Sequence, residues 1–138
     1  GKILGRFEDK GLKIVGLKLR KFPAALLEQH YAAHKERPFF KNLVKFMGSG
    51  PVVALALEGK DAIEVTRKLM GKTNARQAAP GTIRGDLGMS FSNNLVHGSD
   101  GPEAAKTELA LFFGGAGELV AWEPANLGWI YSIEEELR

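Results

Sequence analysis

The sequence predicts a mixed α/β fold in which strands and helices alternate over one sheet. Residues 51–59 are apolar at successive positions, as in a strand buried on both faces. Residues 12–20 form a second strand-like run, and the segments around these two runs have helical periodicity. The 138 residues, 44% apolar and 25% charged, have the composition of a globular protein, so we expect one domain over residues 1–138.

The predicted elements follow one another with short connections. Pro23 and Pro38 suit the first turns of helices, and Gly11 suits the turn after one. In chain order the elements are a helix over 1–11, a strand over 12–20, a helix from 23 to about 35, a helix over 38–47, a strand over 51–59, a helix over 60–71, a short strand over 93–98 and a helix over 102–113. Ser99 or Asp100 is the expected N-cap of the last helix.

Two segments have no sustained periodicity. Residues 71–92 contain four glycines and a proline, and a loop of this length in a compact domain is usually functional or disordered. Residues 114–138 are predicted to be mostly irregular, and the tail Ser132–Arg138 suggests no role.

Composition excludes several classes of protein. The chain has no cysteine, which rules out disulfides and thiolate metal sites. No run is long enough for a membrane span and no signal peptide opens the chain, so we expect a cytoplasmic protein that does not enter a membrane. The net charge of +3 favours phosphate ligands, but the basic residues are scattered between acids, which makes nucleic-acid binding the lowest-ranked function.

Two motifs that suggest familiar sites are rejected. Gly71-Lys72-Thr73 resembles the end of a phosphate-binding P-loop, but Thr66 stands where that loop needs a glycine, and the match follows a helix. His30 and His34 have the spacing of zinc-protease ligands, but no glutamate lies between them. We therefore predict no metal ligand among the side chains.

The stretch Leu95–Pro102 (LVHGSDGP) contains the strongest candidate for chemistry. Gly98 and Ser99 beside His97 leave space for a group the size of a phosphate. The start of the next helix offers N–H donors to an anion, and Glu108 on that helix could orient the ring. A neutral imidazole is a competent nucleophile near neutral pH. The alternative is a structural histidine at the end of a strand.

Four blocks in this order, HYAAHKERPFF, GSGPVVALALEG, PGTIRGDLG and NNLVHGSD, closely resemble the nucleoside diphosphate kinase family over about residues 1–131. The resemblance implies a ferredoxin-like α+β sandwich with a four-stranded antiparallel sheet covered by helices. It implies transfer of the γ-phosphate of ATP, or of another nucleoside triphosphate, to a nucleoside diphosphate through a phosphohistidine. It also implies Mg²⁺ held mainly by the nucleotide's phosphates, and assembly into homohexamers or homotetramers.

The resemblance assigns roles to individual residues. His97 matches the nucleophile, phosphorylated on its δ nitrogen, Glu108 the carboxylate that orients it, and Ser99 the hydroxyl bonded to that carboxylate. Arg67 and Arg84 match the guanidiniums that hold the phosphates. The rest of the implied nucleotide-binding set is Thr73 at the β-phosphate, His34 at the α-phosphate, Tyr31 near the transferred group, Phe39 and Phe91 on opposite sides of the base, Asn94 at the ribose hydroxyls, and Leu43.

The resemblance also exposes a departure at the start of the chain. Family members begin with a central strand carrying a Lys-Pro-Asp run, whose lysine binds the ribose and the γ-phosphate, and no such run is present here. Because Gly1 is not an initiator Met, we expect that an upstream segment has been lost or omitted. A chain truly without it is expected to have weak stability and poor phosphotransfer. The alternative function is therefore a nucleotide-binding or scaffolding protein without turnover.

Overall fold

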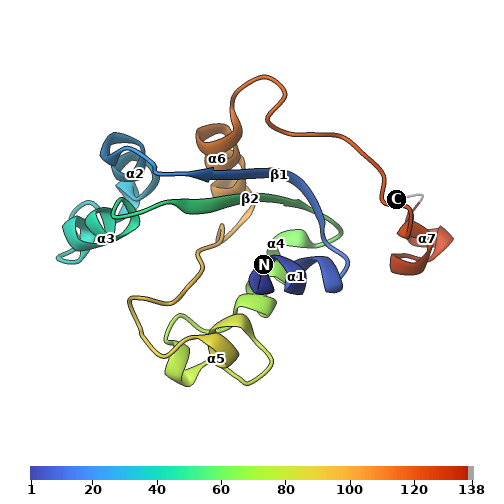
Figure 1. Ribbon diagram of the computed structural model, residues 1–138, viewed down its shortest axis with the longest axis horizontal. Coiled ribbons are helices and arrows are strands. Elements are labelled where there is room, and N and C mark those ends of the chain that lie inside the picture. The colour runs from blue at the N-terminus through green and yellow to red at the C-terminus, as the bar shows by residue number, and fades with distance from the viewer. Residues whose placement is uncertain (137–138) are drawn as a thin grey trace.

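A two-stranded antiparallel sheet runs through the middle of the molecule (Figure 1). The computed structural model describes residues 1–136. Strand β1 (Lys13–Arg20) pairs with β2 (Val52–Glu58) from Lys13 opposite Glu58 to Arg20 opposite Val52. The register shifts once, between Ile14 and Gly16, as in a β-bulge. Both strands predicted from apolar patterning are confirmed.

Helices lie on both sides of this sheet. Helices α2 and α3 lie together at one end of the strands, α1 and α4 lie toward the other end, and α6 lies behind the sheet in the view of Figure 1. The helical elements are α1 (Lys2–Asp9), α2 (Ala24–His30), η1 (Ala32–His34), α3 (Phe40–Met47), α4 (Ala62–Met70), η2 (Ala75–Gln77), α5 (Ile83–Leu87), α6 (Pro102–Phe113), α7 (Leu127–Ile130) and α8 (Ile133–Glu136). Within residues 1–136, no helix has the length and apolarity needed to cross a membrane.

The alternation of side chains along β2 builds two apolar clusters. Leu55 and Leu57 pack against a cluster formed by Phe7, Leu12, Met70 and Ile83. Val52 and Ala54 pack against a second cluster formed by Phe22, Leu27, Tyr31 and Val44. Since successive residues of a strand point to opposite faces, apolar clusters lie on both faces of β2, but Val53, on the face of Leu55 and Leu57, is 49% exposed, so the predicted burial of both faces holds only in part.

The helix that begins after Pro23 is shorter than predicted. It ends at His30 rather than near Lys35, because Tyr31 leaves the helical conformation at φ −96° and ψ 18°. The Tyr31 ring is buried in the second cluster, and the chain continues as the 3₁₀ turn η1. A buried aromatic residue thus ends the helix, and η1 redirects the chain toward α3.

The segment 71–92 is more ordered than predicted, since it contains η2 and α5. Helix α5 is held by its own first turn, where the backbone N–H of Gly85 donates to Thr82 Oγ1 at 3.0 Å. Five residues are too few to produce a helical period in the sequence, so this helix escaped prediction.

The prediction of a strand over 93–98 is wrong. Residues 93–98 carry no strand ladder, and two of their carbonyl oxygens, on Asn94 and Val96, accept hydrogen bonds from the Arg84 guanidinium. Within residues 1–136 the sheet consequently has two strands, fewer than the four that the resemblance implies. The N-cap of α6 is Gly101 rather than Ser99 or Asp100, with Pro102 at the first helical position.

Candidate active site

His97 lies on the extended segment between α5 and α6. The residue is exposed to solvent, while protein atoms surround its ring on several sides, with the Tyr31 ring facing it edge-on at 6.1 Å between centroids. This partial burial, and then the positive charges of Arg84 and His30, lower the pKa of His97 from its ordinary value. A lowered pKa keeps the imidazole neutral, and therefore nucleophilic, at neutral pH.

Gly98 lies in close contact with Met70 of α4. A Cβ atom built on Gly98 would lie 2.7 Å from the sulfur of Met70, which is buried on α4. The missing side chain thus lets the His97 segment approach α4. The space for a phosphate beside His97 stays a prediction.

Glu108 on α6 links two neighbours of His97. Ser99 Oγ donates a hydrogen bond to Glu108 Oε2, which is the pairing that the resemblance implies. The other carboxylate oxygen, Oε1, lies 3.6 Å from His30 Nδ1. Within the described part of the chain no hydrogen bond joins Glu108 to His97, so the orientation of His97 by Glu108 stays a prediction.

Arg84 is the most buried charged side chain around His97, with 6% of its surface exposed. Its guanidinium donates to the carbonyl oxygens of Asn94 at 3.2 Å, Gly71 at 3.0 Å and Val96 at 2.5 Å. Three of its five N–H groups are thus directed at backbone, which leaves two for a ligand. Arg84 therefore shapes the segment that carries His97.

Arg67 is exposed near the end of α4, and its Nη1 lies 3.5 Å from the carbonyl oxygen of Gly98. Burial first, and then the positive charge of Arg67, lower the pKa of Arg84. Two guanidiniums that repel each other in this way form a favourable place for a polyphosphate, which would neutralise both.

Thr73 and Asn94 meet on one side of the site. Thr73 is exposed, and its carbonyl oxygen accepts a hydrogen bond from Asn94 Nδ2 at 3.0 Å. Asn94 is 3% exposed, and its Oδ1 is buried with no hydrogen-bond partner among residues 1–136. The side chain lies beneath the surface here, so its contact with a ribose stays a prediction.

The aromatic residues of the predicted set differ in exposure. Phe39 is 48% exposed and Phe91 is 58% exposed, so each keeps a ring surface open to a ligand. The ring of His34 lies 5.8 Å from that of Phe39, and Leu43 is partly buried against the second cluster. Tyr31 is buried, and this burial, helped by the Glu108 charge, raises the pKa of Tyr31 to about 12.

Sequence reasoning did not include His30 in the site. The structure places it, at the C-terminal end of α2, beside Glu108, against the rings of Tyr31 and Phe112. Its only signal in the sequence is its position directly before Tyr31. His30 is partly buried, whereas His34 is exposed.

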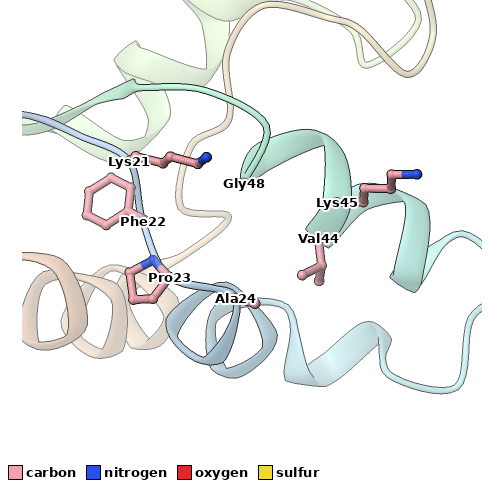
Figure 2. Close-up of a pocket in the computed structure, with 7 residues that line it drawn as sticks. All are labelled: Lys21, Phe22, Pro23, Ala24, Val44, Lys45 and Gly48. Atoms are coloured by element: carbon pink, nitrogen blue, oxygen red, sulfur yellow. The ribbon is translucent and has the colours of Figure 1, made fainter.

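A surface hollow lies away from these residues, between the β1–α2 connection and the end of α3 (Figure 2). Its walls are mostly apolar, with two lysines at the rim. It is lined by Lys21, Phe22, Pro23, Ala24, Val44, Lys45 and Gly48. No predicted site residue lines it.

Comparisons with known proteins identify the family of the chain. The sequence profile described as nucleoside diphosphate kinase matches residues 1–117. The chain is 56% identical over 131 residues to the nucleoside diphosphate kinase of Synechococcus sp. (strain JA-3-3Ab), covering 95% of this chain and 87% of the relative. It is 52% identical over 131 residues to that of Archaeoglobus fulgidus, covering 95% and 86%.

Solved structures share the fold as well. The halophilic nucleoside diphosphate kinase of Halobacterium salinarum, in complex with CDP, matches with a TM-score of 0.91 at 49% identity, over 95% of this chain and 87% of that one. A nucleoside diphosphate kinase family protein from Babesia bovis matches with a TM-score of 0.90 at 45% identity, over 95% and 88%. The predicted α+β fold is therefore confirmed. The chain belongs to the nucleoside diphosphate kinase family.

Proposed function

We propose that this chain is a nucleoside diphosphate kinase, folded as one domain, in which His97 carries the phosphoryl group. The observation that carries the proposal is the setting of His97. It is accessible, its pKa is lowered, and two guanidiniums lie near its segment. Ser99, just before the next helix, is hydrogen-bonded to Glu108 on that helix. A neutral imidazole beside bound phosphates is the arrangement that nucleophilic phosphotransfer needs.

The reaction then proceeds in two balanced steps. The lone pair of Nδ1 of His97 attacks the γ-phosphorus of a nucleoside triphosphate, the bond from that phosphorus to the β–γ bridging oxygen breaks, and the nucleoside diphosphate leaves. A terminal phosphate oxygen of a second nucleoside diphosphate next attacks the phosphohistidine, and the imidazole is restored. No proton needs to leave His97, provided its attacking nitrogen is unprotonated at the start.

The protein's part in both steps is positioning and charge stabilisation. Arg67 and the free N–H groups of Arg84 hold the phosphates, and Thr73 adds a hydroxyl. Mg²⁺ is proposed to be held mainly by the phosphates of the nucleotide. When bound in that way, Mg²⁺ neutralises charge on the phosphates.

The nucleoside is held by stacking. The exposed rings of Phe39 and Phe91 are the proposed walls of the base site. Leu43 and His34 complete the proposed nucleotide-binding set, with His34 at the α-phosphate. Stacking is insensitive to the identity of the base, so broad base tolerance is expected. The relative from Halobacterium salinarum is described with bound CDP, which supports a nucleotide in the same family site. A cytoplasmic location stays a prediction.

The decisive experiment is labelling with γ-³²P-ATP and Mg²⁺. We expect label that is stable in base and labile in acid on the wild type, and none on His97→Ala. Lys68→Ala, an exposed lysine paired with Glu64 on α4, is the matched control and should label like the wild type. Equal labelling of His97→Ala would contradict the proposal. Tight binding of ADP without phosphoryl exchange between GTP and ADP would favour the non-catalytic alternative.

A further inference from the structure

The segment that carries His97 meets the C-terminal end of α4. Arg67 lies in the last turn of this helix, and its Nη1 atom is 3.5 Å from the carbonyl oxygen of Gly98. Met70, the last residue of α4, is 3% exposed and packs in the first of the two apolar clusters. The contacts between this helix end and the segment therefore fix where the proposed nucleophile stands relative to a proposed phosphate ligand.

The residues on either side of His97 both face the first cluster. The Val96 side chain packs against it. Gly98 faces it as well, since a Cβ built on Gly98 would lie 2.7 Å from the sulfur and 3.2 Å from the methyl carbon of Met70. In an extended chain, residues two apart point to one side and the residue between them points to the other. The His97 ring accordingly lies on the opposite side, where it meets the Tyr31 ring of the second cluster.

Arg84 ties the same two segments together. Its guanidinium donates to the carbonyl oxygen of Gly71, the C-cap of α4, at 3.0 Å and to that of Val96 at 2.5 Å. These hydrogen bonds draw the segment toward the end of α4, and Met70 determines how closely the two can approach.

The Met70 sulfur occupies the space that a side chain on Gly98 would need. Atoms in van der Waals contact lie about 3.5–4.0 Å apart, so a Cβ at 2.7 Å would overlap the sulfur. The Met70 side chain is flexible, but it is enclosed in the core, where neighbours are packed as densely as in organic crystals. An added methyl group would therefore push Gly98, and with it His97, away from α4.

We infer that Met70 is a positioning residue for the phosphoryl transfer: its side chain, packed against Gly98, sets how far the His97 ring stands from a phosphate held by Arg67. The catalytic meaning of this contact rests on the proposed kinase function. The contact between Met70 and Gly98 is a feature of the fold and does not depend on that function.

A methyl group at position 98 should slow the chemistry and leave nucleotide binding almost unchanged. The proposed base walls, Phe39 and Phe91, and the helix that carries Arg67 are not displaced, so the affinity for ADP should change by less than about threefold. The attacking nitrogen, however, moves away from the phosphorus. Because a misplacement of about 1 Å can cost about 100-fold in rate, we expect phosphorylation of His97 in Gly98→Ala to slow by about 100-fold.

The test is a double-mutant cycle of Gly98→Ala and Met70→Val, read as the single-turnover rate of His97 phosphorylation with saturating ATP and Mg²⁺. Valine lacks the sulfur and the methyl carbon that the new Cβ would overlap. The slowing caused by Gly98→Ala should therefore be at least about tenfold smaller in the Met70→Val background than in the wild type.

Gly101→Ala is the matched control on the same segment. Nothing lies within 4 Å of a Cβ on Gly101, and its backbone is extended at φ −176°. This substitution should leave the rate unchanged in the wild type and in the Met70→Val background.

Two further measurements decide the question if Gly98→Ala does not fold. NMR of the wild type without nucleotide should show a nuclear Overhauser effect between the Hα protons of Gly98 and the methyl group of Met70. Met70→Val alone, which removes the contact without adding an atom, should slow phosphorylation by at least about fivefold with the ADP affinity kept, whereas Met70→Leu, close to Met in volume, should slow it by less than about twofold.

Several outcomes would overturn the inference. These are equal slowing by Gly98→Ala in both backgrounds, a wild-type rate in Gly98→Ala or in Met70→Val, and the absence of the nuclear Overhauser effect. Slowing matched by an equal loss of ADP affinity would also overturn it, since that indicates a general loss of structure. A wild type that shows the effect but forms no phosphohistidine would instead contradict the proposed function, and with it the catalytic meaning of the contact.

Discussion

At the scale of single residues, Arg84 combines two tasks that usually fall to different groups. Its guanidinium donates hydrogen bonds to three backbone carbonyls of the loop and of the His97 segment. In a sheet, the N–H groups of a neighbouring strand would bond to such carbonyls instead. Its charge lowers the pKa of His97. A single buried cation therefore both holds the nucleophile's backbone and keeps its ring neutral.

Replacing Arg84 should accordingly damage stability as well as chemistry. Arg84→Ala leaves buried carbonyl oxygens without donors, and we expect a loss of at least about 2 kcal/mol in the free energy of unfolding. Urea denaturation followed by tryptophan fluorescence measures it. Arg76→Ala is the matched control, since the exposed Arg76 lies in the same loop, and it should change stability by less than about 0.5 kcal/mol. Equal losses in the two variants would contradict this role of Arg84.

At the scale of elements, the short helix α5 is stabilised by a cap and by contacts with residues outside the helix. Thr82 caps its first turn, and Asp86 accepts from the backbone N–H of Gly81 at 2.8 Å while pairing with Arg6 of α1 at 2.7 Å. Gly85 allows the chain to fold back closely on Ala79. Because Arg84 lies on α5, the contacts that hold this helix also fix the position of the Arg84 guanidinium.

Two glycine substitutions should have opposite effects on stability. A Cβ on Gly85 would lie 2.0 Å from the carbonyl oxygen of Ala79, so Gly85→Ala should destabilise the protein by about 3 kcal/mol. Gly5 lies inside α1 with nothing within 4 Å of its Cβ position, so Gly5→Ala should stabilise it by about 0.5–1 kcal/mol. Thermal unfolding of both variants provides the comparison, and a destabilised Gly5→Ala or a neutral Gly85→Ala would be inconsistent with this packing.

At the scale of the whole molecule, large apolar side chains remain on the surface. Leu17 and Leu19 on β1 are 56% and 71% exposed, and Trp129 on α7 is 93% exposed. In Figure 1, α7 lies at the end of the molecule opposite α2 and α3, so these residues are spread over the surface. Apolar area of this kind commonly marks surfaces that are covered by other chains.

We therefore expect this chain to form a homo-oligomer, a hexamer or a tetramer, that hides part of this surface. Sedimentation equilibrium should give a mass several times that of one chain. Leu19→Lys should shift the distribution toward smaller species, because it places a charge where apolar contact is expected. Leu87→Lys, at an exposed leucine on α5, is the control and should leave the mass unchanged. A wild type that sediments as a monomer would contradict the expectation.

Local sequence determined much of this protein. Apolar patterning predicted β1, β2, α4 and α6. Four motif blocks along the chain predicted the family, and the resemblance to that family implied the bond between Ser99 and Glu108. These features depend on residues close together in the chain, or on motifs whose spacing is characteristic, so they can be recognised without coordinates.

Only the tertiary structure decided the rest. Residues 93–98 have the composition of a strand, but a strand needs a neighbour, and the carbonyls of Asn94 and Val96 bond to Arg84 instead. The position of His30 before Tyr31 did not predict its neighbour Glu108, which depends on the packing of α2 against α6. The periodicity of a sequence indicates which face of a helix or strand is apolar. The hydrogen-bond partners of a backbone carbonyl or a buried imidazole depend instead on contacts between segments far apart in the chain. A local sequence pattern does not contain the free energies of those contacts.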